Sequence, residues 1–355
     1  MKQIRIVGSG LIGTSMGLAL VGQKCSLEMV DNEPSRAKLA QELVGTSHGG
    51  GSDLVILATP ASALPEIIHR EFHLNPKAKF IDIASTKTKS QLLVETIEGL
   101  PMRFCGTHPM AGREVGGPQS ARADLFQGRP WVYTPSKATQ SDVTEEVLWL
   151  ICALGGQPIL MSGKEHDEAV ALISHLPQIG ASLIAHLLQG ANPDFLALAG
   201  QGLRDTTRIA SSDPKMWSEI IVDNRGYILP LLAKMNQEIG DLISHLDQES
   251  ELSQESELAK FIQGGNIGQK GIPGKHGGVI RNYHFLSIVI QDKAGQLAQL
   301  FRECAEAGVN IEDLSIEHSP GQLTGLITLA LSPIDAPILA EHLSARGWSI
   351  HDVRK

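Results

Sequence analysis

The sequence contains few cysteines, and they are spaced too widely to organise a fold. Only four occur among its 355 residues, and no two of them form a Cys-x-x-Cys pair. They are Cys25, Cys105, Cys152 and Cys304. This spacing argues against a disulfide framework and against a cysteine-based zinc site. We therefore predict reduced, mostly buried thiols, no metal centre and a cytoplasmic protein.

Clusters of positive charge and long apolar runs are also lacking. Lys and Arg total 30 against 39 Asp and Glu, which leaves a net charge of −9. Without a basic cluster, the charge argues against nucleic acid or an anionic membrane as the main partner. We find no uninterrupted apolar run near the roughly 20 residues that span a bilayer. The amino-terminal residues enter a strand directly, without the layout of a signal peptide.

The periodicity of the apolar residues divides the chain into parts, as expected for its length. Over residues 1–163, short apolar strands alternate with helical stretches, which predicts a parallel, doubly wound α/β sheet. Over residues 164–262, apolar residues recur at spacings of three and four without strand signals, which predicts an all-α domain. Apolar helices in this position often pack against a second subunit, so we expect a homodimer.

The last part of the chain shows a different pattern. Residues 263–281 are rich in glycine and predict a flexible linker. Residues 282–355 then read as strand, helix, two strands, helix and strand. This βαββαβ order is typical of ferredoxin-like modules.

A glycine motif near the amino terminus predicts a dinucleotide site. Gly8, Gly10 and Gly13 follow a strand and open a helix, and Asp31 ends the next strand, 18 residues after Gly13. Gly8 permits the tight turn, Gly10 the close approach of a pyrophosphate, and Gly13 the packing of helix on strand. The helix amino terminus then faces the phosphates.

Asp31 sets the predicted choice between the two nicotinamide cofactors. Its carboxylate can accept hydrogen bonds from the adenosine ribose and repels a 2′-phosphate, so NAD is preferred over NADP. Arg36, five residues further on, is a cation that softens this preference. The predicted cofactor-binding residues are Gly8, Gly10, Leu11, Ile12, Gly13, Asp31, Thr59 and Pro60.

Four further motifs follow in order: DIASTK at residues 82–87, GTHPMAGRE at 106–114, HD at 166–167 with SHLP at 174–177, and DTTRIASSDP from 205 through Trp217. In these motifs the first 260 residues resemble the prephenate and arogenate dehydrogenases. The resemblance implies oxidation of a ring hydroxyl by NAD and loss of a ring carboxylate as carbon dioxide. The aromatic product then serves tyrosine biosynthesis.

Such a reaction needs a group that takes the hydroxyl proton, and His108 is the candidate. A neutral imidazole suits this task near pH 7. His108 follows a predicted strand, on a Gly/Pro loop at the edge of the sheet where such folds bind ligands. The resemblance also implies that Ser85, after another strand, shares its hydrogen-bond network. The alternative for Ser85 is a cap on the next helix.

The substrate carries two carboxylates, and Arg208 is the candidate cation because guanidinium binds carboxylate through two hydrogen bonds. The alternative is a salt bridge to Asp205, three residues earlier on the same helical face. Other candidate substrate residues from the resemblance are His175, Gln178, Glu114 and Trp217. Trp217 reads equally as core.

Gln178 bears on the choice of substrate. Many relatives carry histidine here, and glutamine is neutral at every pH and both donates and accepts hydrogen bonds. The position approaches the part of the substrate where prephenate has a keto group and arogenate an amino acid. We expect prephenate as the substrate, with arogenate as the alternative.

The carboxy-terminal module resembles an ACT domain, a unit that binds amino acids on metabolic enzymes. Asp292, Gly295 and Asn310 are its candidate effector residues, and L-tyrosine, the pathway product, is the expected inhibitor. The alternative is a module that only assists oligomerisation.

Two other functions were weighed. A β-hydroxyacid dehydrogenase uses a lysine on the first long helix of its helical domain, but Lys164 precedes that helix here. A non-catalytic regulator that binds NAD and an amino acid would leave the set of His108, Ser85 and Arg208 unexplained.

Overall fold

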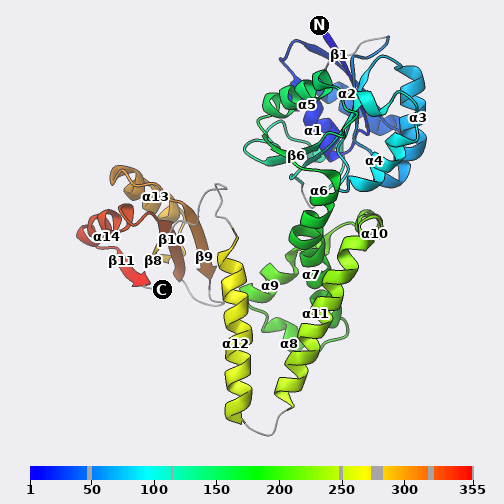
Figure 1. Ribbon diagram of the computed structural model, residues 1–355. Helices are drawn as coiled ribbons and strands as arrows, with labels where there is room; N and C mark the ends of the chain where they lie inside the picture. Colours follow the sequence, from blue (N-terminus) through cyan, green and yellow to red (C-terminus); the bar gives the residue numbers. More distant parts are fainter. Residues whose placement is uncertain (46–49, 113–114, 248–250, 273–282, 319–323, 354–355) are drawn as a thin grey trace. The chain divides into compact units, whose positions relative to one another are not determined.

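The computed structural model describes residues 1–355 except 46–49, 113–114, 248–250, 273–282, 319–323 and 354–355 (Figure 1). The chain forms two compact units, residues 1–237 and 238–355. The first unit holds a large sheet with helices around it and then a group of helices. The second unit holds a helix and a small sheet.

The large sheet has seven strands in the order β2-β1-β3-β4-β5-β6-β7. They are β1 (Lys2–Val7), β2 (Cys25–Val30), β3 (Leu54–Leu57), β4 (Lys79–Asp82), β5 (Phe104–Pro109), β6 (Pro130–Thr134) and β7 (Gln157–Leu160). The helices that alternate with them are α1 (Leu11–Leu20), α2 (Pro34–Val44), α3 (Leu64–Leu74), α4 (Thr88–Glu95) and α5 (Ser141–Ala153). The predicted Rossmann-like α/β domain is therefore confirmed.

Burial of both faces explains the continuous apolar strands. All four residues of β3 are at most 1% exposed. Leu54 and Ile56 belong to one buried cluster, and Val55 and Leu57 belong to another. Helices cover both faces of a parallel sheet, so its central strands need apolar side chains at every position.

The prediction of an entirely parallel sheet is wrong at one edge. β1 to β5 run parallel, but β6 pairs antiparallel with β5, and β7 then pairs parallel with β6. Between β5 and β6 the described residues contain one short 3₁₀ turn, Pro118–Ser120, and no longer helix. Without a helical crossover to carry the chain back, β6 returns in the opposite direction.

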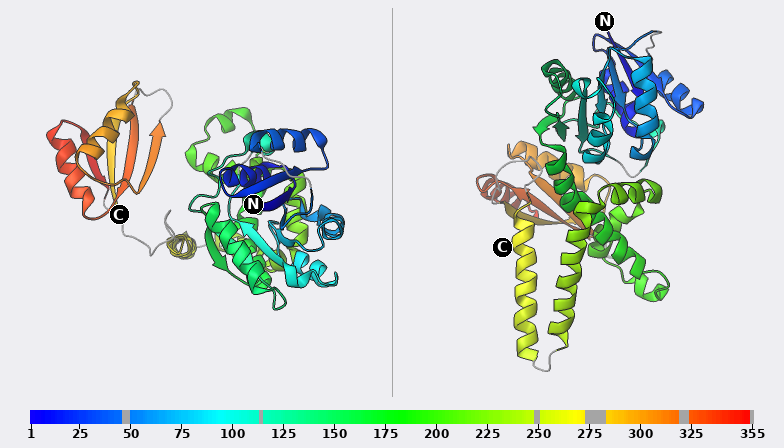
Figure 2. Two further views of the ribbon diagram at one scale, coloured as in Figure 1. Left: turned by 90° about the horizontal axis from the view of Figure 1, so that it is seen from above. Right: turned by 45° about the vertical axis from the view of Figure 1, so that its right-hand side comes forward.

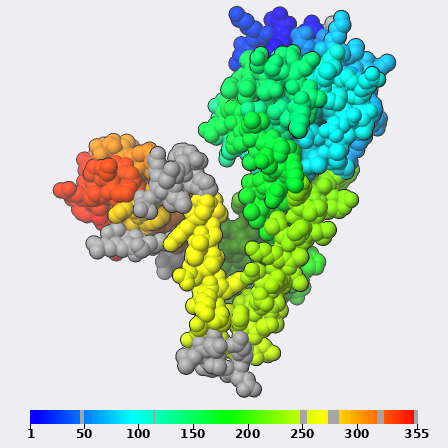
Figure 3. Space-filling view, in the orientation of Figure 1, coloured from blue at the N-terminus to red at the C-terminus, as the bar shows by residue number. Residues whose placement is uncertain are grey.

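The helical part begins directly after the sheet. Ser162 and Glu165 form a capping box that starts α6 (Gly163–Val170). A π-helical turn (Ala171–His175) and α7 (Leu176–Leu187) follow, then α8 (Pro193–Ala197), α9 (Gln201–Thr207), a 3₁₀ turn (Arg208–Ser211), α10 (Pro214–Asp223) and α11 (Arg225–Leu246). Figure 3 shows the green surface of α6 against the sheet domain. The predicted helical domain is confirmed.

The stretch from Gly163 to Leu187 is long and apolar enough, by length and composition alone, to cross a membrane. Polar residues interrupt this stretch, so it contains no long run of consecutive apolar residues. The same stretch carries His166, Asp167 and His175, which are buried and hydrogen-bonded to other elements of this unit. Polar groups engaged in this way fit a helix packed within a globular domain.

The second unit contains α12 (Glu251–Lys270) and a four-stranded antiparallel sheet in the order β11-β8-β10-β9. Its elements are β8 (His284–Gln291), α13 (Gln296–Glu306), β9 (Asp313–His318), β10 (Thr324–Leu331), α14 (Asp335–Ala345) and β11 (Ser349–Val353). Leu300 and Leu339 from the two helices pack with Ile288 and Leu329 of the sheet, so both helices cover one face (Figure 2). This is the predicted βαββαβ order.

The predicted linker begins too early. Residues 263–270, expected to be flexible, continue α12, while residues 273–281 of the predicted linker lie outside the described residues. Glycine costs a helix about 1 kcal/mol relative to alanine. Extending a helix that is already formed gains one hydrogen bond per residue, which offsets this cost.

Candidate active site

The glycine turn between β1 and α1 is shaped for a phosphate group. Gly8 has a φ of +107°, and a Cβ there would lie 2.2 Å from the Ala58 carbonyl oxygen. A Cβ on Gly13 would lie 2.0 Å from the Gly8 oxygen, whereas one on Gly10 would meet nothing within 4 Å. Gly8 and Gly13 are thus required by the fold, and Gly10 leaves open space at the amino terminus of α1.

Two polar groups beside this turn support a nucleotide site. Thr59 follows β3 and its methyl group would lie 3.1 Å from a Cβ on Gly8, while its buried hydroxyl has no hydrogen-bond partner. Asp31 ends β2, and its two oxygens accept the Ser9 and Glu33 backbone N–H groups at 2.8 and 2.9 Å. These residues fit the expected dinucleotide. Of the other predicted residues, Leu11 and Ile12 open α1, and Pro60 is exposed just after Thr59.

His108 lies at the end of a chain of buried polar groups. It is part of β5 itself, not of the loop after it as predicted, because it pairs with Val132 of β6. Its Nδ1 lies 2.9 Å from His166 Nε2, and His166 Nδ1 lies 2.8 Å from Asp167 Oδ1. The two rings meet edge to face, with centroids 5.1 Å apart.

This chain selects the tautomer of His108. A carboxylate only accepts hydrogen bonds, so His166 Nδ1 carries a proton toward Asp167. In a neutral His166 ring, Nε2 is then the acceptor, and His108 Nδ1 must donate to it. The result is a neutral His108 whose Nε2 holds a free lone pair, which is the form a general base requires.

The surroundings keep His108 neutral. Burial and the charges of His166, Lys87 and His175 lower its pKa well below 6.5, although Asp167 acts in the opposite direction. Burial likewise lowers the pKa of His175 to about 4. Burial alone would raise the pKa of Asp167, but hydrogen bonds from His166, Thr88 and Lys87 outweigh it and lower that pKa. Near pH 7 His108 and His175 are therefore neutral beside the Asp167 carboxylate.

Asp167 also connects the helical part to the sheet domain. Its Oδ1 and Oδ2 accept the backbone N–H groups of Lys87 and Thr88 at 2.7 and 2.8 Å. No side chain from the β4–α4 loop caps α4, so the alternative that Ser85 is that cap is wrong. A carboxylate from α6 takes this place, because it can accept both N–H groups at the start of α4.

Lys87 forms a second buried connection. Its ammonium group is fully buried, donates to Asp82 Oδ1 at 2.6 Å and donates to the Thr107 carbonyl at 2.7 Å. It thereby joins the ends of β4 and β5. Paired in this way, the buried ammonium group is stabilised by one carboxylate and one carbonyl.

The helical wall of the site depends on the π-helical turn. Nine residues separate His166 from His175, which in a regular α-helix is about 2.5 turns and therefore opposite faces. The wider π turn over residues 171–175 changes the rotation, and both side chains are at most 1% exposed. Pro177 has no N–H for the preceding turn, which accounts for the break in regular bonding there. π turns of this kind are frequent at functional sites.

Asn224 completes this wall. Its side-chain amide donates to the Asp167 carbonyl at 2.8 Å and lies 3.0 Å from His175 Nδ1. The His175 ring meets the Trp217 ring edge to face at 6.0 Å. The structure thus brings His175 and Trp217 together beside the Asp167 network, as the substrate wall requires.

Gln178 is held by two hydroxyl groups. Its Oε1 accepts from Ser212 at 3.3 Å, and its Nε2 donates to Ser182 at 3.4 Å. The 3₁₀ turn that contains Arg208 packs against α7, directly before Ser212. Arg208 itself is exposed in the single chain.

Ser85 follows β4 and is partly buried. Asp82 pairs with Gly106 across β4 and β5, so the two strands deliver Ser85 and His108 to the same edge of the sheet. Glu114 lies outside the described residues. Lys164 lies within α6, not before it as expected, but it is exposed there and offers no support for a lysine-based site.

His166, Asp167 and Asn224 are functional residues that were not predicted from the sequence. His166 and Asp167 form the HD motif, and a histidine next to an aspartate could have indicated a hydrogen-bonded catalytic pair. Asn224 had no local signal, because its partners are 57 and 49 residues away along the chain.

The candidate effector residues lie in the second unit. Asp292 and Gly295 lie in the loop between β8 and α13, and both are exposed. Gly295 has a φ of +91°, a conformation that favours glycine. Asn310 lies between α13 and β9 and donates to Glu312 at 3.1 Å.

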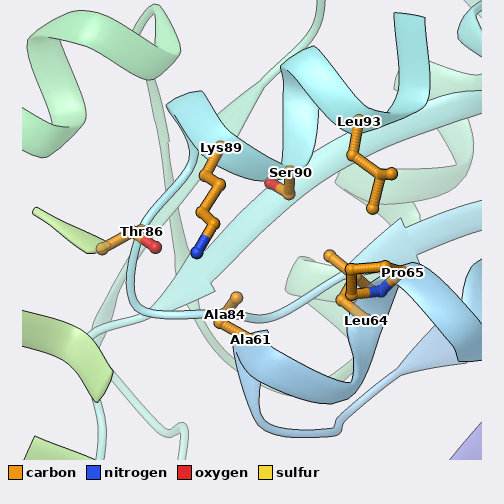
Figure 4. A pocket seen from close by; sticks show the side chains of 8 residues that line it. All are labelled: Ala61, Leu64, Pro65, Ala84, Thr86, Lys89, Ser90 and Leu93. Atoms are coloured by element: carbon orange, nitrogen blue, oxygen red, sulfur yellow. The ribbon is translucent and has the colours of Figure 1, made fainter. Parts of the chain in front are cut away.

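A small pocket lies near the ends of β3 and β4 (Figure 4). It is lined by Ala61, Leu64, Pro65, Ala84, Thr86, Lys89, Ser90 and Leu93. Its walls are largely apolar, and Lys89, the cation among these lining residues, pairs with Asp223. The pocket is therefore a poor site for an anionic substrate.

Comparison with known proteins agrees with this geometry. Residues 18–160 match the family model "Prephenate dehydrogenase, nucleotide-binding domain", and residues 162–263 match "Prephenate dehydrogenase, dimerization domain". The chain is 28% identical to the "Probable prephenate dehydrogenase NovF" of Streptomyces niveus over 358 residues, which is 98% of this chain and 99% of that one.

Two solved structures are also similar. One is prephenate dehydrogenase from Aquifex aeolicus in complex with hydroxyphenyl propionate and NAD+ (27% identity, TM-score 0.68, 76% of this chain and 97% of that one). The other is Synechocystis arogenate dehydrogenase (28% identity, TM-score 0.63, 75% and 98%).

The open space at Gly10 predicts a contrast between two glycine substitutions. Gly13→Ala should lower the free energy of unfolding by roughly 1–3 kcal/mol, because its Cβ collides with the Gly8 carbonyl. Gly10→Ala should change it by less than about 1 kcal/mol and yet weaken NAD binding. Urea unfolding and calorimetric titration with NAD measure the two effects. Equal losses of stability in both variants would contradict this assignment of roles.

The hydrogen bonds of Asp167 predict a large loss of stability in Asp167→Asn. The amide cannot accept from Lys87, Thr88 and His166 together, so the free energy of unfolding should fall by about 2–4 kcal/mol. Because the folded-state pKa of Asp167 is lowered, its stabilisation is present above an ordinary aspartate pKa of about 3.9 and is lost as the pH falls through the lowered value.

Asp142→Asn is the matched control, since Asp142 lies on α5 and pairs with Lys79 at the surface. Exposed pairs contribute less than about 1 kcal/mol. Urea unfolding at pH 7 compares the two variants, and a similar small effect in both would rule out the proposed role of Asp167.

Proposed function

The chain belongs to the prephenate dehydrogenase family, and from this premise we propose that it oxidises and decarboxylates prephenate to 4-hydroxyphenylpyruvate while reducing NAD. One observation carries the proposal. His108, at the sheet edge, is held neutral with its Nε2 free by the chain through His166 to Asp167. This is the general base that oxidation of a ring hydroxyl needs.

Different residues of the site bind the cofactor and transfer the proton. The turn of Gly8, Gly10 and Gly13, with Asp31 and Thr59, holds the cofactor. NAD, when bound, supplies the acceptor for the hydride. His108 Nε2 takes the proton of the substrate hydroxyl, and the positive charge that develops on its ring is stabilised through His166 by the Asp167 carboxylate.

Substrate binding is assigned to both sides of the site. We place Ser85 beside the hydroxyl, where it helps to orient this group toward His108. Arg208 binds a substrate carboxylate, as guanidinium groups do in bidentate pairs. His175 and Trp217 form the remaining wall, with Trp217 packed against the His175 ring. Glu114, which lies outside the described residues, is proposed as a further substrate-binding residue. Loss of the ring carboxylate then yields the aromatic product.

Arogenate is the second candidate substrate, because Gln178 does not exclude it. The Gln178 amide is fixed by Ser182 and Ser212 and remains neutral, so it does not discriminate by charge between a keto acid and an amino acid. NADH absorbance followed with prephenate and then with arogenate decides between them. Turnover of neither would refute the proposed function and favour a non-catalytic regulator.

We also propose a homodimer formed through the helical part. In the single chain Leu187 and Leu198 are 80% and 83% exposed, and Leu183 and Leu229 are more than half exposed. Apolar groups exposed to this extent indicate a surface that a partner covers. Residues 162–263 match a family model described as a dimerization domain. The charge and composition fit a cytoplasmic enzyme.

The carboxy-terminal module is proposed to be an ACT domain that binds L-tyrosine. Its βαββαβ order, with helices on one face of the sheet, agrees with this assignment. Asp292, Gly295 and Asn310 are the proposed effector residues. Inhibition by the end product of the pathway would then act from a module with its own hydrophobic core.

His108→Asn should lower kcat by roughly 10²–10⁴, because the base is lost, and should leave the Kd of NAD unchanged. His69→Asn, on the exposed face of α3 in the sheet domain, is the control and should keep the wild-type rate. Since the pKa of His108 is lowered, kcat/KM of the wild type should hold below pH 6.5 and fall only at lower pH. Stopped-flow and steady-state assays of NADH formation test this, and an active His108→Asn variant would disprove the role of His108.

Deletion of residues 279–355 should leave kcat within a few-fold of the wild type and abolish the response to L-tyrosine. The Aquifex aeolicus structure aligns over 97% of its own length with 76% of this chain. Initial rates with and without L-tyrosine are the measurement. Inhibition that persists in the truncated enzyme would place tyrosine in the active site instead.

A further inference from the structure

A pocket extends from the glycine turn toward the start of α2. It is lined by Gly10, Glu33, Ser35, Arg36, Leu39 and residues 116–119. Gly10 marks the position of the pyrophosphate, and Asp31, at the end of β2, marks the side of the adenosine ribose. The pocket therefore receives the adenosine half of the cofactor, where NAD has a 2′-hydroxyl and NADP has a 2′-phosphate.

Two residues of this pocket are of the kinds that bind phosphate. Arg36 offers a planar guanidinium with several N–H donors, and Ser35 offers a hydroxyl. Both lie in the first turn of α2, whose amino terminus adds a partial positive charge. Arg36 is the cation among the described residues that line the pocket.

Glu33 engages both of these residues. Its Oε2 lies 2.8 Å from Arg36 Nε, and its Oε1 accepts from the Ser35 hydroxyl at 2.8 Å. The carboxylate thus occupies Arg36 Nε and the Ser35 hydroxyl, two of the donors that a phosphate would use, and adds a second negative charge next to Asp31. Both effects disfavour a 2′-phosphate.

Glu33 and Asp31 differ in what else they do. Asp31 holds the backbone of Ser9 and of residue 33, so its replacement disturbs the glycine turn. The Glu33 side chain bonds only to Ser35 and Arg36 in the structure, and it makes no capping bond to α2. Its removal should leave the fold intact.

We infer that Glu33 determines the selectivity for NAD by closing a latent 2′-phosphate site formed by Ser35 and Arg36. This inference rests on the cofactor part of the proposed function and is independent of the identity of the substrate. It also explains why the presence of Arg36, a cation that alone would favour NADP, does not make NADP the preferred cofactor.

The test measures nucleotide binding without substrate. In Glu33→Ala, calorimetric titration should show the Kd of 2′,5′-ADP falling about tenfold, the gain expected from one charge-assisted pair, and that of 5′-ADP changing less than about twofold. Glu42→Ala is the matched control, because it removes the same charge from the far end of α2. It should change neither Kd. Adding Arg36→Ala to Glu33→Ala should abolish the gain.

Two results of this titration would overturn the inference. An unchanged ratio of the two Kd values in Glu33→Ala shows that Glu33 does not set selectivity, and a gain that survives Arg36→Ala shows that no phosphate site is formed there. If the wild type binds 5′-ADP and NAD but does not turn over prephenate or arogenate, the proposed reaction fails and the inference stands. If it binds no nucleotide, the cofactor assignment and the inference fail together.

Discussion

The buried carboxylate of Asp167 is the interaction on which the site depends. It accepts the first backbone N–H groups of α4 from the sheet domain and the ring proton of His166 from its own helix. A buried carboxylate is costly unless every lone pair is engaged. Here the donors that satisfy it also define the site. The Asp167 carboxylate therefore connects the helical part to the sheet domain and caps the start of α4. It also determines the tautomer of His108.

Burial tunes the chemistry around this charge. The same enclosure that would raise the pKa of a carboxylic acid lowers the pKa of His108 and of His175, so acid and bases coexist in useful forms near pH 7. Lys87, which is paired with Asp82, adds to the lowering of the His108 pKa. The π-helical turn then lets one helix present both His166 and His175 to this network.

Cofactor binding and proton transfer depend on different sets of polar groups in the chain. The glycine turn and Asp31 serve the cofactor, the Asp167 network serves proton transfer, and the carboxy-terminal module has a hydrophobic core of its own. Within the cofactor pocket, Asp31 holds the backbone while Glu33 holds side chains. A residue that only engages other side chains can vary without loss of the fold, which makes Glu33 the more adjustable of the two.

The sequence alone determined the alternation of strands and helices, the glycine turn, the helical part and the βαββαβ order of the last module. These follow from periodicity and from residues adjacent in the chain, so local reasoning reaches them. It also identified His108, whose motif is contiguous, and noted the motif of His166 and Asp167 without a role.

Only the tertiary structure decided the antiparallel return of β6, the continuation of α12 through the glycines, the exposure of Arg208 and the partners of Asp167. It likewise placed Asn224 and the pairing of Glu33 with Arg36. Each of these depends on which groups meet across long separations or on how the chain turns between elements. Hydrogen bonding and burial determine such contacts only when the whole domain is folded, because the residues next to a donor in the sequence do not indicate which distant acceptor it will meet.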